Sequence, residues 1–202
     1  MAKTYLKFLE PYEKELSRKI KKKGLTITVS GISGAGKTDG ARAIAKAFKL
    51  RYISAGKILR DIAKKRRMSL EQLSAIRGSE IDHEMDRRSL EFAMKGKVVL
   101  DGRLTGWVAG DWADVRIFYV CPLNVRAKRV VNRDNVTIEE AKINLQKRDD
   151  QDHEKYQKVY GIDSFDRSIY NLVIDNRDLT KKESKIFPVK LVKEFLRKKK
   201  LL

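Results

Sequence analysis

Short apolar, β-branched runs alternate along this chain with longer segments whose apolar residues recur at helical spacing. The runs predict buried strands at residues 25–30, 51–54, 97–101, 115–120 and 171–175. The segments between them predict helices at about 41–48, 55–67, 80–95, 122–133 and 137–160, and a closing helix that starts at Pro188. Strands that alternate with helices predict a parallel five-stranded sheet covered on both faces, a three-layer α/β/α domain.

The chain before the first strand has one apolar stripe at helical spacing. Its members are Tyr5, Leu9, Tyr12, Leu16 and Ile20. Pro11 would kink or interrupt this helix, and Lys21 to Gly24 is typical of a helix end, with cations followed by glycine. We therefore expect residues 1–24 to be a helical extension packed on the domain, rather than a partner-binding helix. Residues 181–202 are predicted to form a basic C-terminal helix.

The first predicted strand runs directly into a glycine-rich stretch. It reads Gly31-Ile32-Ser33-Gly34-Ala35-Gly36-Lys37-Thr38, the pattern G-x-x-x-x-G-K-T of a phosphate-binding P-loop. Glycines let the backbone amides approach phosphate oxygens, Lys37 can reach the β- and γ-phosphates, and Thr38 can offer its hydroxyl to Mg²⁺. A chain of this size matches the pattern by chance roughly one time in a hundred. The flanking strand and helix make nucleotide binding the better interpretation.

Composition limits the class of protein. The 202 residues suit one domain with a real core, and 42% are hydrophobic. The sequence has no apolar run near twenty residues and no signal peptide, so we expect neither a membrane protein nor a secreted one. The single cysteine, Cys121, follows an apolar run and is expected to be buried rather than nucleophilic. A chain without an intramolecular disulfide fits the cytoplasm.

The net charge of +19 raises the question of nucleic-acid binding. The excess lies mainly at the two ends of the chain. Residues 1–24 carry eight basic and three acidic residues, and residues 181–202 carry nine basic and two acidic ones. Because the central domain is only mildly basic, a nucleic-acid partner is possible but is not the favoured interpretation.

A set of arginines indicates which reaction a nucleotide bound at the P-loop could undergo. Its members are Arg60, Arg87, Arg103, Arg129, Arg133 and Arg148. They lie at predicted strand ends or in the helices beside them, and strands 51–54 and 97–101 bring Ser54, Asp101 and Arg103 to the edge of the sheet that carries Lys37. Phosphoryl transfer is catalysed by positioning and cationic stabilisation, for which arginine is well suited. The pattern therefore favours a phosphotransferase.

At this point the sequence resembles the cytidylate kinases, a family of P-loop nucleoside monophosphate kinases. The shared motifs are the P-loop, Ser54-Ala55-Gly56 with Arg60, Asp101-Gly102-Arg103, Arg126-Ala127-x-Arg129 and Arg148-Asp149-Asp150-x-Asp152. Three further motifs are similar to the short archaeal type: Ile81-Asp82-x-Glu84-x-Asp86-Arg87-Arg88, Gly102-Arg103-Leu104-x-Gly106-Trp107 and Tyr160-Gly161-Ile162-Asp163. The resemblance covers about residues 25–180.

The resemblance implies a kinase domain over residues 25–180, with small acceptor-binding helices and a lid at about 134–152, that phosphorylates CMP and dCMP with ATP and Mg²⁺. Lys37, Arg103 and Arg148 would be catalytic, and Thr38 would hold the metal. Residues of the P-loop from Gly31 to Thr38 would bind ATP together with Arg129 and Arg133. The implied acceptor site consists of Ser54, Arg60, Arg87, Asp101, Arg103 and Asp152. We expect a monomer.

The sequence also departs from bacterial cytidylate kinases. Those relatives have aspartate where this chain has Leu104, they carry an acceptor-binding insertion for which there is no room here, and their later lid arginines are replaced by Gln151, His153 and Lys155. An adenylate kinase-like enzyme therefore stays open as an alternative. From another class, an RNA-binding assembly ATPase also stays open, with the basic ends as its contacts.

Overall fold

All five predicted strands form, and all pair in parallel in the computed structural model, which describes residues 2–76 and 78–202. The strands are β1 (Thr26–Gly31), β2 (Arg51–Ser54), β3 (Val98–Asp101), β4 (Val115–Val120) and β5 (Leu172–Asp175). Their order across the sheet is β2-β3-β1-β4-β5. β1 is therefore central, and Gly31, at its carboxyl end, is paired with Tyr119 of β4.

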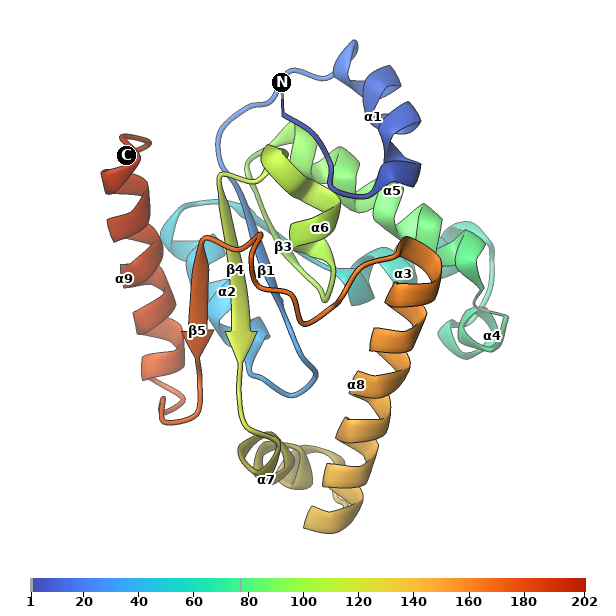
Figure 1. Ribbon diagram of the computed structural model, residues 1–202, viewed down its shortest axis with the longest axis vertical. Helices are drawn as coiled ribbons and strands as arrows, with labels where there is room; N and C mark the ends of the chain where they lie inside the picture. Colours follow the sequence, from blue (N-terminus) through green and yellow to red (C-terminus); the bar gives the residue numbers. More distant parts are fainter. Residues whose placement is uncertain (1, 77) are drawn as a thin grey trace.

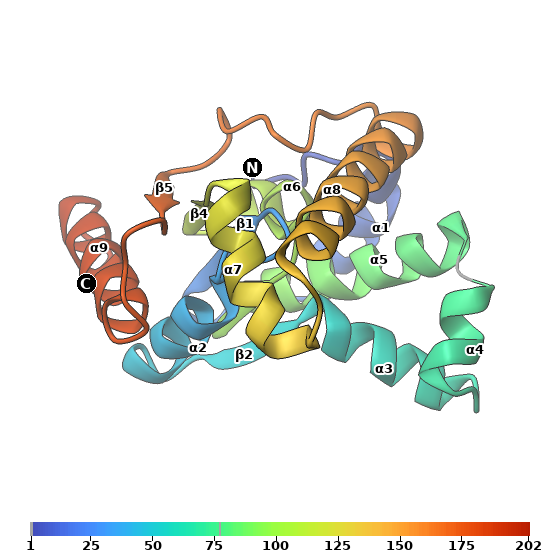
Figure 2. The same ribbon diagram turned by 90° about the horizontal axis from the view of Figure 1, so that it is seen from below.

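Helices cover both faces of the sheet, which confirms the predicted three-layer architecture (Figures 1 and 2). On one face, α2 (Lys37–Ala47) packs against α9 (Glu183–Lys198). The buried side chains between this pair and the sheet include Ile27, Ile44 and Val192. On the other face, α5 (Ser79–Lys95) and α6 (Thr105–Ala109) lie over β3 and β1. No apolar pattern had predicted α6, whose five residues are too few to show a helical period.

Two further pairs of helices extend beyond the sheet at its carboxyl edge. α3 (Ala55–Lys65) and α4 (Leu70–Ala75) follow β2, while α7 (Leu123–Asp134) and α8 (Ile138–Tyr160) follow β4. Capping boxes of Ser69 with Gln72 and of Thr137 with Glu140 begin α4 and α8. α8 has 23 residues and runs from α7 along the side of the molecule toward α5 (Figures 1 and 2).

The N-terminal segment is less helical than its apolar stripe predicted. A 3-10 turn, η1 (Lys7–Leu9), leads into α1 (Glu10–Ser17). Pro11 lies in the first turn of α1, where its missing N–H is harmless, so it does not kink the helix. The expected helix end at Lys21–Gly24 is wrong, because α1 has already ended and the Lys23 amide bonds to the Lys95 carbonyl. Leu6 and Leu9 are buried against α5 and α6.

The closing helix begins five residues earlier than predicted. Thr180 and Glu183 bond reciprocally through side chain and backbone amide, so the start signal is T-x-x-E rather than Pro188. Pro188 lies inside α9, where it removes one hydrogen bond to the preceding turn. In the described part of the chain, no helix is both long and apolar enough to cross a bilayer.

Candidate active site

The turn after β1 is shaped for a compact anion. Gly31 has φ of +137°, and a Cβ there would collide with the backbone of Tyr119 on the paired strand. Gly36 caps α2 in the left-handed conformation at φ of +81°. The loop therefore ends at a helix N-terminus, where free amides and the helix dipole favour phosphate. The Lys37 ammonium lies across this loop and donates to the Ile32 carbonyl at 2.7 Å.

The surroundings of Lys37 disfavour its positive charge. Burial is the main cause that lowers the pKa of Lys37 to about 8, and the nearby guanidiniums of Arg103 and Arg148 act in the same direction. The Asp101 carboxylate opposes both effects. Three cations thus lie close together beside the P-loop, with the carboxylates of Asp101, Asp149 and Asp152 near them. The electrostatic energy of such a site becomes most favourable when a highly charged anion binds.

Asp101 lies behind the P-loop rather than in an open acceptor site. Its buried carboxylate accepts hydrogen bonds from the Thr38 hydroxyl at 2.9 Å and from the Tyr52 hydroxyl at 2.7 Å. Burial and this hydrogen bond raise the pKa of Tyr52 to about 12, so the phenol remains a donor. The interaction ties the end of β3 to the start of α2.

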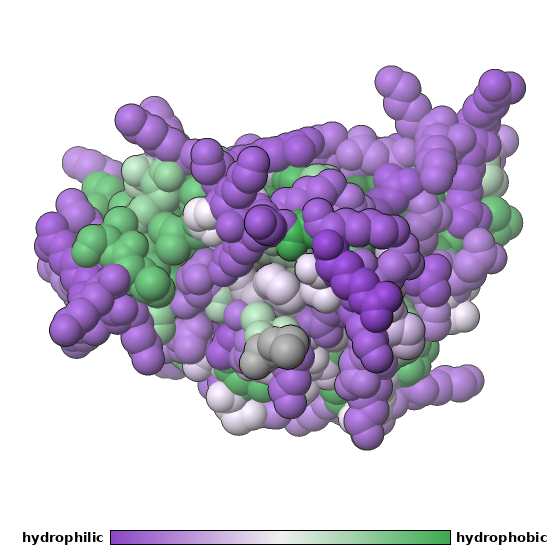
Figure 3. Space-filling model, turned by 90° about the horizontal axis from the view of Figure 1, so that it is seen from above, coloured by the Kyte–Doolittle hydropathy of each residue, from purple (hydrophilic) through white to green (hydrophobic). Residues whose placement is uncertain are grey.

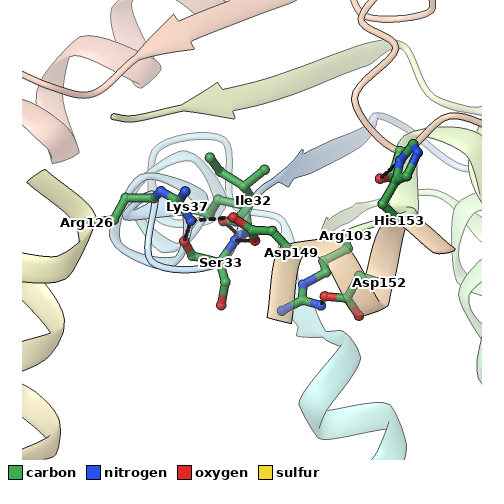
Figure 4. Close-up of polar contacts among 9 residues, drawn as sticks. Ile32, Ser33, Lys37, Arg103, Arg126, Asp149, Asp152 and His153 are labelled. Carbon is green, nitrogen blue, oxygen red and sulfur yellow. Dashed lines mark hydrogen bonds and ion pairs between the residues drawn. The ribbon is translucent and has the colours of Figure 1, made fainter. Parts of the chain in front are cut away.

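A cavity of about 500 Å³ opens from Lys37 toward α5. The predicted residues that line it are Lys37, Arg103, Arg148 and Asp152. They come from three separate parts of the chain: the start of α2, the turn after β3, and α8. Arg103 also forms an ion pair with Asp152 (Figure 4). The structure therefore brings together all three residues predicted to be catalytic.

Four of the predicted acceptor residues do not line this cavity: Asp101, which lies behind the P-loop, and Ser54, Arg60 and Arg87. Ser54 caps α3, its hydroxyl accepting from the Lys57 amide at 3.1 Å. Arg60 is exposed on α3, with its side chain reaching back near the cavity-lining Gly56. Arg87 is exposed and lines a separate groove together with Tyr12.

The expectation for Arg87 needs correction because of the phase of its helix. Asp82, Asp86 and Ser89 are spaced by four and three residues on α5, and all three line the cavity. Arg87 lies one residue past Asp86 and is therefore turned about 100° away around the helix. The sequence pattern identified the right helix but not the face that the helix turns toward the cavity.

Two site residues that sequence reasoning left without a role are Arg126 on α7 and Asp149 on α8. The Arg126 guanidinium donates to Asp149 Oδ2 at 2.6 Å and to the Ser33 carbonyl at 2.9 Å (Figure 4). The Ser33 amide in turn donates to Asp149 Oδ1 at 3.4 Å. Both side chains are almost fully buried. This network fastens α8 to the backbone of the P-loop next to the residue that bears Arg148.

On the opposite side of the P-loop, Arg129 marks the predicted ATP side. Its guanidinium donates to the Asn176 carbonyl at 2.6 Å, and the Asn176 amide donates to the Ala35 carbonyl at 2.8 Å. Arg129 thus lies beside Gly36 at the start of α2. The side chain of Arg133, the other residue predicted to bind ATP, lies outside the described part of the structure.

A P-loop at the carboxyl edge of a parallel sheet, a cationic cavity beside it and a helix pair fastened over it define a P-loop kinase. The chain belongs to the cytidylate kinase-like family, whose model matches residues 26–178. The resemblance and the enzyme class predicted from the motifs are thereby confirmed.

Individual relatives agree with the family. The chain is 41% identical over 176 residues to a cytidylate kinase of Staphylothermus marinus, a match that covers 86% of this chain and 97% of that one. It is 44% identical over 153 residues to a cytidylate kinase of Pyrococcus abyssi, covering 75% and 84%. A shikimate kinase of Bacteroides thetaiotaomicron superposes with a TM-score of 0.59 at 18% identity, covering 86% and 98%. That last likeness shows the fold alone.

Proposed function

We propose that this chain transfers the γ-phosphoryl group of ATP to CMP and dCMP, giving the diphosphate and ADP. The observation that carries the proposal is the single cavity onto which Lys37, Arg103 and Arg148 converge. Its length from the P-loop to α5 leaves room for an acceptor beyond the transferred group. Membership of the cytidylate kinase-like family supports a cytidine monophosphate as that acceptor.

The residues of the chain supply the positioning and the positive charge. Lys37 and the loop amides would hold the β- and γ-phosphates, and Arg129 would lie along ATP on the Asn176 side. Arg103 and Arg148 would contact the transferring group from β3 and from α8, where negative charge spreads over its oxygens. Direct in-line transfer needs no covalent enzyme intermediate. Closure of α8 over the cavity would exclude water that could take the phosphoryl group.

Thr38 and Asp101 fit a magnesium ion. The Thr38 hydroxyl and the Asp101 carboxylate already share a hydrogen bond, and both are the hard oxygen donors that Mg²⁺ prefers. The described residues hold no cluster of three or more His, Cys, Asp or Glu side chains suited to a metal, so phosphates and water would complete the shell. Bound Mg²⁺ neutralises phosphate charge.

On the acceptor side, Arg60, Arg103 and Asp152 are the members of the predicted set that lie at or beside the cavity. We propose that Arg60 and Arg103 hold the acceptor phosphate and that Asp152 approaches the nucleoside. Ser54 would act through the start of α3, which it caps. We further propose that the enzyme works as a monomer in the cytoplasm.

A coupled assay of ADP release tests the function across CMP, dCMP, UMP, AMP and GMP. We expect the highest kcat/KM with CMP and dCMP. The Lys37→Ala variant serves as the matched control for contaminating kinases, and its kcat should fall by roughly 10²–10³, the loss expected for one preorganised charge contact. Preference for AMP would indicate an adenylate kinase, and no turnover of any of the five would exclude the kinase activity.

A further inference from the structure

The cavity beside the P-loop has two ends of opposite character. Its P-loop end is cationic, with Lys37, Arg103 and Arg148. Its far end, formed by α5 and the last turns of α8, contains two carboxylates, Asp82 and Asp86. An anionic substrate makes acidic walls costly, so two carboxylates in this position call for a hydrogen-bond donor on the ligand.

Both carboxylates are held in place from α8. Lys155 forms an ion pair with Asp82, whose side chain is only 8% exposed. The Tyr160 hydroxyl donates to Asp86 Oδ2 at 2.6 Å. Asp82 and Asp86 lie one helical turn apart on the face of α5 that lines the cavity. The two groups are therefore fixed, closely spaced hydrogen-bond acceptors, and each has a carboxylate that can accept several bonds.

The remaining walls of this end suit a flat, mostly apolar ring. They are formed by Leu59, Met85, Leu104, Val108 and Tyr156. Leu104 is 7% exposed and cannot hydrogen-bond through its side chain, so this residue offers no polar side-chain group to a base. Asp82 and Asp86 are the carboxylates that α5 presents to a ring placed in this slot.

We propose that Asp82 and Asp86 together read the exocyclic amine of cytosine and thereby exclude uracil. This inference rests on the proposed function. Cytosine carries an amine donor at C4, whereas uracil carries a carbonyl acceptor at the same place. An ionised carboxylate can only accept hydrogen bonds, so it accepts one from the amine of cytosine. The carbonyl of uracil would face the same carboxylate without a donor and without water. Sites of this kind reject the mismatched ligand by large factors.

The test is the ratio of kcat/KM for CMP to that for UMP, measured on the wild type, Asp82→Asn and Asp86→Asn. Asparagine keeps the shape of the aspartate side chain, but its amide can present either a hydrogen-bond donor or an acceptor to the base. We expect the ratio to fall at least tenfold in one of the two variants, through loss of CMP turnover and gain of UMP turnover. Because both substrates are measured on one preparation, the ratio does not depend on the fraction of protein that is folded.

The matched control is Glu80→Gln, which neutralises an exposed carboxylate on the same helix that pairs with Arg66. Its ratio should equal that of the wild type. A ratio unchanged in both aspartate variants overturns the inference. So does a loss confined to CMP that spares dCMP, since that pattern indicates a contact with the ribose 2′-hydroxyl. Wild-type protein that phosphorylates neither CMP nor dCMP would instead contradict the proposed function.

Discussion

Arg126 and Asp149 form the most deeply buried ion pair of the site, with side-chain exposures of 5% and 7%. Such pairs add little net stability, because desolvation offsets their attraction. Removal of one partner is costly, since it leaves the other charge uncompensated in the interior. The pair also hydrogen-bonds to the Ser33 backbone from α7 and α8. Loss of one partner would therefore disturb the geometry of the P-loop as well as the stability of the fold.

We predict that Arg126→Met lowers the free energy of unfolding by about 3–5 kcal/mol, as measured by denaturant titration. The double variant Arg126→Met with Asp149→Leu should recover most of this loss, because it removes both charges. Lys128→Met, at an exposed position of the same helix, is the control and should stay within about 0.5 kcal/mol of the wild type. A double variant no more stable than the single one would contradict this explanation.

At this scale the sequence predicted which residues reach the cavity where a motif fixed both residue type and place. Lys37, Arg103 and Arg148 all reach the cavity, because strand ends and the P-loop determine where they lie. Arg87 does not reach it, because to predict where a helical residue points one must know which face the helix turns toward the cavity, and not only that a helix forms. The role of Asp149 was missed for a related reason. Its neighbours Arg148 and Asp150 are charged too, and only the packing of the helix shows that Asp149 is the buried one of the three.

Among the elements, the N-terminal segment does more than cover the domain. Phe8 stacks on His83 of α5 at 4.2 Å between ring centroids and on Tyr160 of α8 at 5.5 Å. The Thr4 hydroxyl also donates to the Val108 carbonyl of α6. The segment thus supports three helices that line the cavity, from outside it. It precedes residue 26, where the family match begins.

We predict that Phe8→Ala lowers stability by about 1–2 kcal/mol, the value of a half-buried aromatic contact, and raises KM for CMP several-fold. The physical reason is that Tyr160, which holds Asp86, loses its packing partner. Thermal unfolding and steady-state kinetics measure the two effects. Phe187→Ala, at an exposed aromatic on α9, is the control. A change in stability with KM unaltered would show that the segment only stabilises the fold.

The elements themselves were largely predictable. Runs of β-branched residues identified all five strands, and apolar residues at helical spacing identified α8 at 137–160. Two of the errors came from proline. Pro11 and Pro188 were each given the role that proline most often plays near helices, but Thr180 with Glu183 determines where α9 begins. A side-chain cap is a stronger start signal than a proline several residues later.

For the whole molecule, the question is what the charge of +19 does. The marked chain ends lie away from α7 and the carboxyl edge of the sheet (Figure 1), and the surface seen from above is mostly hydrophilic, with a hydrophobic patch at one side (Figure 3). α9 is anchored by Val192 and Leu196, which are fully buried, whereas residues 197–202 are all exposed. The basic tail is therefore structurally separate from the site.

Deletion of residues 197–202 is predicted to leave kcat and KM for CMP within twofold of the wild type, because no proposed site residue touches the tail. Steady-state kinetics at low and at physiological ionic strength measure this. The RNA-binding alternative predicts a different result, namely loss of salt-dependent binding to a single-stranded RNA. Binding of RNA by the full chain that disappears with the tail, together with RNA-stimulated ATP hydrolysis, would favour that alternative.

α8 has a consequence for the energetics of binding. It is one unbroken helix of 23 residues, about 34 Å long, that carries Arg148 and Asp149 beside the P-loop and Tyr156 and Tyr160 beside α5. A rigid rod in contact with both ends of the cavity makes the two ligands share one ordering cost. By thermodynamic linkage, the factor by which ATP strengthens CMP binding equals the factor by which CMP strengthens ATP binding, and a shared ordering cost makes that factor greater than one.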